Sequence, residues 1–305
     1  MKNFTRNILA LIAAFIWGTA FVGQSVSASK MGAFTFNFSR CIIATVTLII
    51  LSIVFDRLKK PAQKTEEEKR IERRSIIRGG VGCGVLLAIA SNLQQIGLVE
   101  TSAGKAGFIT SLYVVLVPVF AIVLGKRAPS RVWLAVVIAT AGMYLLCVSE
   151  NFTIASGDIL IFICAIVFAG HILVVDRYVA TADAIKMSCV QFLVAGILSG
   201  IGMLIWEEFD WQSIVSCIGP LLYVGVLSSG VAYTLQIIAQ RGADPTVITI
   251  LLSLESVFSV IAGAVVLGDT MLPREYTGCI LMFAAVMLAQ IPLRRKKKQL
   301  PEAEG

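Results

Sequence analysis

Three ionisable residues lie inside long apolar stretches of the sequence, where charge is rare. They are Glu255, Arg40 and His171. A charge at the centre of a membrane helix costs roughly 2.5–3.5 kcal/mol on insertion scales, so such a side chain should face protein or water. Glu255, in the middle of its stretch, could accept a proton during ion coupling, anchor a substrate, or lock neighbouring helices together through hydrogen bonds.

The roles of the other two residues are equally open. Arg40 lies within partial snorkelling reach of one membrane surface, so it fits an interface anchor or a helix clamp that supports a site. His171 could titrate near neutral pH, or it could be a hydrogen-bonded packing residue. One histidine cannot build a histidine-rich metal site, and no P-loop sequence occurs. We therefore expect no metal, no cofactor and no enzymatic activity.

Amide side chains in the same stretches are further candidates. Hydrogen bonding between helices is their default role in a membrane. Asn92, Gln95 and Gln236 are the amides expected to reach a central cavity, because their stretches occupy corresponding places in the two halves of the chain.

The composition indicates the class of protein. Hydrophobic residues make up 57% and charged residues 15% of the 305 residues, and the mean hydropathy is +0.85; soluble domains carry roughly 25% charged residues. The apolar residues form runs near the roughly 20 residues that a spanning helix needs, too uniform for barrel strands. We expect an all-α integral membrane protein with ten transmembrane helices. The expected spans are 8–28, 33–55, 79–98, 106–125, 131–149, 158–175, 186–206, 217–240, 246–267 and 276–293.

The positive charges sort by side of the membrane. If the N-terminus is cytoplasmic and the spans alternate, all but four of the 26 lysines and arginines lie in cytoplasmic segments, chiefly the loop 56–78 and the tail 294–305. This arrangement follows the positive-inside rule for the inner (plasma) membrane, with both termini cytoplasmic. It also explains the net charge of +7 without a nucleic-acid partner.

Two helix starts can be placed within this scheme. Thr65 and Glu68 fit a capping box in the loop 56–78, which could be a short surface helix or a solvated linker. Asp244 and Pro245 fit the cap and first turn of the ninth span.

Short internal matches divide the chain into two halves. They relate spans one and six, two and seven, and four and nine, always five spans apart. Because five is odd, the second half enters the membrane inverted, an architecture typical of carriers that alternate between two access states. We expect repeats at 1–149 and 150–293, followed by the tail. The matched segments are Trp17-Gly18 with Ala169-Gly170, Arg40–Ala44 with Gln191–Ala195, and Pro118–Phe120 with Ser256–Phe258.

Several segments together resemble the EamA branch of the drug/metabolite transporter superfamily. They are Phe15–Thr19, Gly107–Pro118, Leu252–Phe258 and Leu267–Asp269. The resemblance implies two inverted five-helix repeats around a central cavity, and export, or sometimes uptake, of amino acids and related metabolites. It makes Arg40 a supporting residue and gives these cavity candidates: Trp17, Asn92, Gln95, Tyr113, His171, Tyr233, Gln236 and Glu255.

Two departures from the family pattern concern the helices that bear these residues. The family often has Glu-Pro where this chain has Glu255-Ser256, so the sequence does not decide whether the ninth helix is kinked. In the fourth helix, Leu124-Gly125-Lys126 comes earlier than the corresponding stretch of the second half, and Pro118 can kink the helix.

We therefore expect a secondary active transporter that moves small organic metabolites such as amino acids by alternating access, as an exporter rather than an importer. Its partners would be a small-molecule substrate, the lipid bilayer and protons, with Glu255 in proton coupling, and it could be a monomer or a homodimer. A multidrug exporter like the small four-helix members of the superfamily is an alternative. A membrane scaffold or sensor subunit that transports nothing is another.

The predicted topology can be tested by cysteine labelling. Glu150→Cys and Glu208→Cys should react with a membrane-impermeant maleimide added to intact cells, since both positions are expected outside. Gln299→Cys, in the tail, should react only after permeabilisation. Labelling of all three from the same side would contradict the inverted repeats.

Overall fold

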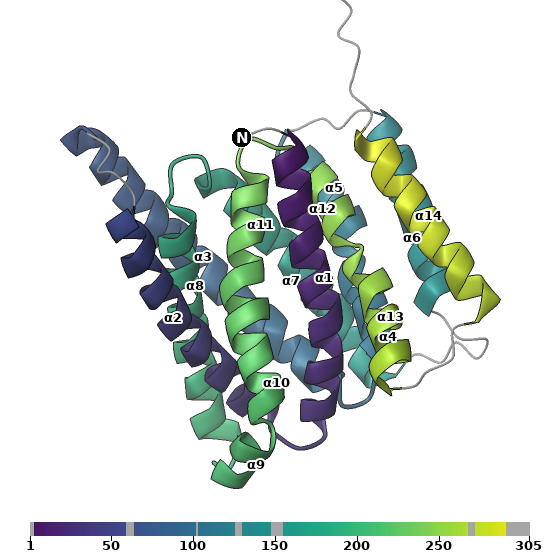
Figure 1. The fold of residues 1–305 in the computed structure, drawn as a ribbon, viewed down its shortest axis with the longest axis horizontal. Helices are drawn as coiled ribbons and strands as arrows, with labels where there is room; N and C mark the ends of the chain where they lie inside the picture. The colour runs from purple at the N-terminus through teal and green to yellow at the C-terminus, as the bar shows by residue number, and fades with distance from the viewer. Residues whose placement is uncertain are drawn as a thin grey trace, which may run out of the picture.

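The computed structural model describes residues 3–58, 64–101, 103–125, 130–147, 155–267 and 272–290, and every regular element in these ranges is helical. Figure 1 shows the helices side by side in one bundle. They are α1 (Asn3–Ala28), α2 (Ala33–Leu58), α3 (Glu66–Gly97), α4 (Ala103–Ser111), α5 (Tyr113–Val123), α6 (Ser130–Cys147), α7 (Ser156–Tyr178), α8 (Ala184–Trp206), α9 (Trp211–Ser216), α10 (Ile218–Leu222), the π-helix η1 (Tyr223–Ala232), α11 (Tyr233–Gln240), α12 (Pro245–Leu252), α13 (Glu255–Leu267) and α14 (Pro273–Gln290).

Eight helical segments among the described residues are long and apolar enough to cross a membrane. Three of them are composite, formed by α4 with α5, by α10 with η1 and α11, and by α12 with α13. Two shorter apolar helices, Val132–Leu145 and Tyr276–Ala289, lie where the fifth and tenth spans are expected. The expectation of an all-helical, multi-pass membrane protein is therefore confirmed.

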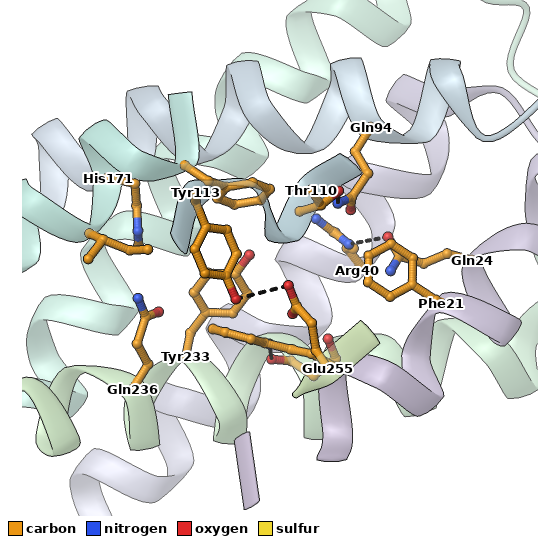
Figure 2. Close-up of a pocket in the computed structure, with 14 residues that line it drawn as sticks. Phe21, Gln24, Arg40, Gln94, Thr110, Tyr113, His171, Tyr233, Gln236 and Glu255 are labelled. Atoms are coloured by element: carbon orange, nitrogen blue, oxygen red, sulfur yellow. Dashed lines mark hydrogen bonds between the residues drawn. The ribbon is translucent and has the colours of Figure 1, made fainter. Parts of the chain in front are cut away.

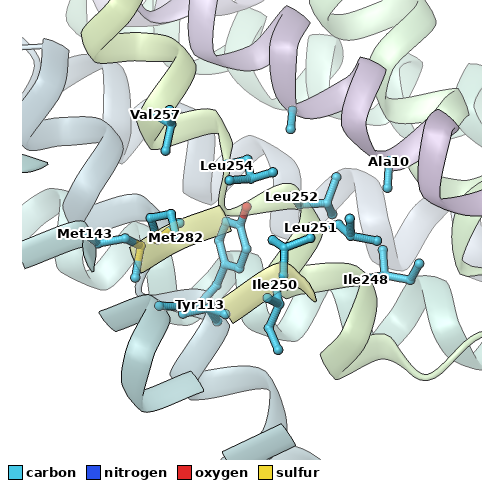
Figure 3. Packing of buried hydrophobic residues seen from close by; sticks show 14 of the residues in the cluster. Ala10, Tyr113, Met143, Ile248, Ile250, Leu251, Leu252, Leu254, Val257 and Met282 are labelled. Carbon is cyan, nitrogen blue, oxygen red and sulfur yellow. The ribbon is translucent and has the colours of Figure 1, made fainter. Parts of the chain in front are cut away.

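The bundle has a central group of helices between two flanking groups. In Figure 1, α2, α3 and α8 lie on the left, α1 and α11–α13 in the centre, and α6 with α14 on the right. The α3 helix packs on α7 and α8, α2 packs on α8, and α14 packs on α6. The largest buried cluster joins α12 and α13 to α1, α5, α6 and α14, through side chains such as Ile250, Leu254, Tyr113 and Met143 (Figure 3).

Two of the composite spans are interrupted near their middle. The α4 helix ends at Ser111 and α5 begins at Tyr113, and α12 ends at Leu252 and α13 begins at Glu255. Backbone groups freed inside a membrane need partners within the protein. Some are met by tightened turns: the amide of Leu254 donates to the carbonyl of Leu251 over 3.3 Å.

Neither interruption occurs at a proline. Pro118 lies inside α5, six residues after the break at Leu112. Although this chain has Glu255-Ser256 where the family often has Glu-Pro, the ninth span is still interrupted, directly before this pair. Hydroxyl groups support the second break, since Ser253 and Ser256 each donate to the carbonyl three residues earlier, over 2.9 and 2.7 Å. Such side-chain bonds to the backbone compete with regular helix geometry.

Both expected helix caps are present. Thr65 and Glu68 form the capping box, with the Glu68 amide donating to the Thr65 hydroxyl over 3.2 Å. The helix that starts there does not stop at the membrane surface but continues to Gly97, so the expected surface segment is the first part of the third spanning helix. Asp244 caps α12 by accepting from the Thr246 amide over 2.8 Å. Residues 59–63 of the loop and the basic tail 294–305 lie outside the described residues.

The contact between α1 and α13 depends on Gly18. A Cβ atom at this position would lie 2.5 Å from the Glu255 carbonyl oxygen and 2.9 Å from the Ser259 amide nitrogen. Backbone atoms cannot move aside independently, so any side chain here must push the two helices apart. Glycines at helix crossings commonly permit such close approach in membranes.

Gly18→Ala should therefore destabilise the protein by about 1–3 kcal/mol, the usual cost of overpacking. Thermal unfolding of the detergent-solubilised protein measures the effect. Gly219→Ala is the matched control, because nothing lies within 4 Å of its Cβ position. An equal melting temperature for the two variants would show that the close contact at Gly18 is unimportant.

Candidate substrate cavity

A cavity lies at the centre of the bundle, beside both helix breaks. Its volume is about 40 Å³, and it carries charged, amide, hydroxyl and aromatic side chains (Figure 2). Its lining comes from α1, α2, α3, α4, α5, α7, η1, α11 and α13. The lining residues are Trp17, Phe21, Gln24, Arg40, Gln94, Thr110, Tyr113, Phe168, His171, Ile172, Ser228, Tyr233, Gln236 and Glu255.

The Glu255 carboxylate, at the break between α12 and α13, accepts hydrogen bonds from residues at the break between α4 and α5. Ser111 and Tyr113, on either side of Leu112, donate to Glu255 Oε1 over 3.2 and 3.0 Å. Glu255 is the first residue of α13, where the helix dipole favours negative charge. The side chain is 4% exposed, and Oε2 accepts no hydrogen bond from a described residue. One carboxylate oxygen is thus left for a further partner.

The Arg40 guanidinium is the positive group of the cavity. Arg40 is 4% exposed, so it does not snorkel to a surface. Its Nη1 donates to Gln24 Oε1 over 3.1 Å, and the guanidinium lies 5.9 Å from the centre of the Phe36 ring, within the range of a cation–π contact. Nε is buried and unpaired, and no carboxylate of the described residues lies within 4.0 Å. Arg40 and Glu255 therefore line one cavity without forming an ion pair.

Aromatic rings form the wall around Tyr233. The Trp17 and Phe192 rings lie 4.7 and 5.3 Å from the Tyr233 ring, both in edge-on geometry. The Trp17 indole donates to the Ser228 carbonyl within η1, over 3.2 Å. Wide π-helical turns often occur at functional positions, and this one directly precedes Tyr233 and Gln236.

His171 and Gln236 face each other at one end of the cavity, and Arg40 with Gln24 lies at the other (Figure 2). His171 Nε2 lies 3.1 Å from Gln191 Oε1, while Nδ1 is buried without a partner. The His171 ring meets the Tyr233 ring edge-on at 5.9 Å.

Six of the eight residues predicted as cavity candidates lie on the cavity wall, as does Arg40: they are Trp17, Tyr113, His171, Tyr233, Gln236 and Glu255. Asn92 and Gln95 do not line it. Asn92 accepts from Asn37 over 2.9 Å and donates to Ser199 over 2.9 Å, which joins α3 to α2 and α8. Gln95 donates to the Gln24 carbonyl over 3.1 Å. Both amides connect helices instead.

Seven lining residues were not predicted, although some had a signal. Phe21 and Gln24 lie four and seven residues after Trp17, on the same face of one helix. Phe168 lies three residues before His171 and four before Ile172, and each of these spacings places the two residues on one face of α7. The remaining three, Gln94, Thr110 and Ser228, had no pattern that separated them from their neighbours.

The hydrogen bond from Tyr113 can be tested by a double-mutant cycle. Tyr113→Phe should cost about 1–3 kcal/mol of stability, since it leaves a buried carboxylate with one donor fewer. In a Glu255→Met background the same change should cost less, because the acceptor is gone. The measurement is thermal unfolding of the four proteins in detergent, and equal losses in both backgrounds would exclude this pairing.

Two known proteins that are similar to this chain are named as transporters. A protein named as an uncharacterized transporter from Archaeoglobus fulgidus is 29% identical over 298 residues, covering 95% of this chain and 87% of that protein. The uncharacterized transporter YwfM of Bacillus subtilis is 24% identical over 307 residues, covering 97% of each chain. A solved crystal structure superposes with a TM-score of 0.76 at 16% identity, over 95% of this chain and 97% of that one, which shows a shared fold.

A sequence model of the EamA-like transporter family matches the chain twice, at residues 5–148 and 155–290. These two segments together span most of the chain, one in each half. The protein belongs to the EamA-like transporter family.

Proposed function

We propose that the protein is a secondary active transporter of the plasma membrane that exports small organic metabolites such as amino acids by alternating access. Family membership supports the transporter class. The double match supports a repeat in each half, with boundaries near 1–149 and 150–293. Ten spans with cytoplasmic ends would make the second repeat inverted, the arrangement on which alternating access depends in many carriers.

One observation carries the choice of substrate class: Arg40 and Glu255 line one cavity, and each retains unpaired polar atoms. A free amino acid carries an ammonium and a carboxylate at neutral pH. The guanidinium of Arg40 suits the carboxylate, which it can bind through two parallel hydrogen bonds. Glu255 Oε2 suits the ammonium. Two buried charges that do not neutralise each other are costly in a membrane, and a zwitterion would neutralise both.

The same carboxylate offers a route for coupling. A protonated Glu255 no longer attracts an ammonium group, so a proton and the substrate would compete for this residue. A proton entering from one side would then release a substrate on that side and be exchanged for it on the other. The chain would work as an antiporter driven by the proton gradient.

The cavity volume is about 40 Å³, too small for an amino acid. Ligand pockets commonly measure roughly 300–1,000 Å³, so a substrate enters only if the surrounding helices separate. The breaks at Leu112 and at Ser253–Leu254 divide two spans into half-helices. Rotation of one half against the other would open the cavity. Both breaks lie beside Glu255, so binding there is coupled directly to the elements that would move.

The alternatives differ in what they require of the cavity. A multidrug exporter needs no matched pair of opposite charges, whereas this cavity is lined by a guanidinium and a carboxylate that form no ion pair with each other. A scaffold or sensor subunit that transports nothing would have no reason to enclose two unpaired charges. These differences favour the carrier of zwitterionic metabolites.

Flux measurements in proteoliposomes with an imposed proton gradient test the proposal. Glu255→Gln and Arg40→Met should each reduce amino-acid flux about tenfold or more, because a hydrogen bond to a charged group contributes about 1.5–3 kcal/mol. Glu208→Gln and Arg70→Met are the matched controls at exposed positions and should retain flux. Absence of flux for every amino acid, or full flux in both cavity variants, would overturn the proposal.

A further inference from the structure

We propose that His171 and Gln236 form a subsite for an uncharged hydrogen-bonding group, so that the transported amino acid carries an amide or hydroxyl on its side chain. This inference rests on the proposed function and extends it from the charged groups of the substrate to its side chain. It concerns the end of the cavity opposite Arg40 (Figure 2).

The first argument is that this end is polar, buried and unpaired. Gln236 and His171 are each 1% exposed. The Gln236 amide makes no hydrogen bond to any described residue, and its Oε1 is buried. His171 Nδ1 is buried and unpaired as well. An unpaired buried polar atom costs about 1–3 kcal/mol. Because both residues line the cavity, a ligand bound there would supply the missing partners.

The second argument is the pattern of donors and acceptors. With Gln191 Oε1 accepting from Nε2–H, His171 Nδ1 is the acceptor of the neutral ring. Gln236 adds a carbonyl acceptor and an amide donor. A ligand amide can donate to Nδ1 and exchange bonds with Gln236 at the same time. A hydroxyl group can satisfy part of the same pattern, whereas a hydrocarbon satisfies none of it.

The third argument excludes a charged side chain. The charged groups of the cavity are Arg40 and Glu255, and Figure 2 shows neither beside His171. The other neighbours of His171 are aromatic, with Phe168 at 6.4 Å and Tyr233 at 5.9 Å between ring centres. A carboxylate or ammonium placed there would be desolvated without a counter-charge from the described wall, which is far costlier than burying an amide.

The position of this subsite also fits an amino acid whose carboxylate is bound by Arg40 and whose ammonium group is bound by Glu255. In Figure 2 the Tyr113 and Glu255 side chains lie between the two ends of the cavity. An amino acid with its carboxylate toward Arg40 and its ammonium at Glu255 would direct its side chain toward Gln236. The Tyr233 ring, one helical turn before Gln236 on α11, would form the wall along that side chain.

The experiment uses pairs of amino acids of similar shape that differ in one polar group. Efflux from proteoliposomes is measured for asparagine against leucine, threonine against valine, and asparagine against aspartate. The wild-type protein should prefer asparagine and threonine by about tenfold or more, since leaving one buried polar group unpaired costs about 1–3 kcal/mol. Gln236→Met should lower the ratio of asparagine flux to leucine flux, whereas the matched control Gln212→Met, at an exposed position, should retain the wild-type ratio.

A second measurement does not depend on a variant that folds. Asparagine should raise the melting temperature of the detergent-solubilised wild-type protein more than leucine or aspartate at equal concentration. Equal transport or preferred transport of leucine and valine by the wild type would overturn this inference and leave the proposed function standing, as would an unchanged preference in folded Gln236→Met. Absence of flux for all amino acids would overturn both.

Discussion

The buried carboxylate of Glu255 is the constraint on which the centre of the bundle depends. A charged or protonated carboxyl group inside a membrane must find donors within the protein. It finds them on both sides of the break at Leu112, in the hydroxyl groups of Ser111 and Tyr113. Each half of the chain thus contributes a broken helix, and the carboxylate of one half is held by the hydroxyl groups of the other.

Some polar residues around this centre connect helices to each other, and others line the cavity. On α2, Asn37 and Arg40 lie one turn apart, yet Asn37 bonds to Asn92 on α3 while Arg40 bonds to Gln24 on α1. Gln95 donates to the Gln24 backbone and so fixes the helix whose side chain holds Arg40. The amides away from the cavity therefore position the charge that lines it.

The fold class could be predicted from the sequence because an apolar run of about 20 residues has few ways to satisfy its backbone in a membrane. The breaks at Leu112 and Ser253–Leu254 could not, because no proline or glycine occupies them. The sequence also did not reveal which side of each helix faces the cavity. Gln94 and Gln95 are adjacent in sequence and differ by about 100° around the helix, so only packing decides that Gln94 faces the cavity.

At each end of the bundle, a connection between two spanning segments contacts the start of a third segment. The connection after the third spanning segment holds the start of α7: Glu100 accepts from Ser156 and Gly157, and Lys105 lies 2.5 Å from Asp158. The connection after the eighth segment holds the start of α1, where Arg6 donates to the carbonyls of Arg241 and Gly242.

The connections after segments three and eight are five segments apart, as are the helix starts of segments one and six that they contact. Under the proposed inverted repeat the two contacts would therefore be equivalent closures at opposite ends. They differ in chemistry, because one joins charged side chains and the other joins a guanidinium to backbone carbonyls. The proposed alternating access would require one closure to separate while the other remains intact, so that the cavity opens to one side of the membrane at a time.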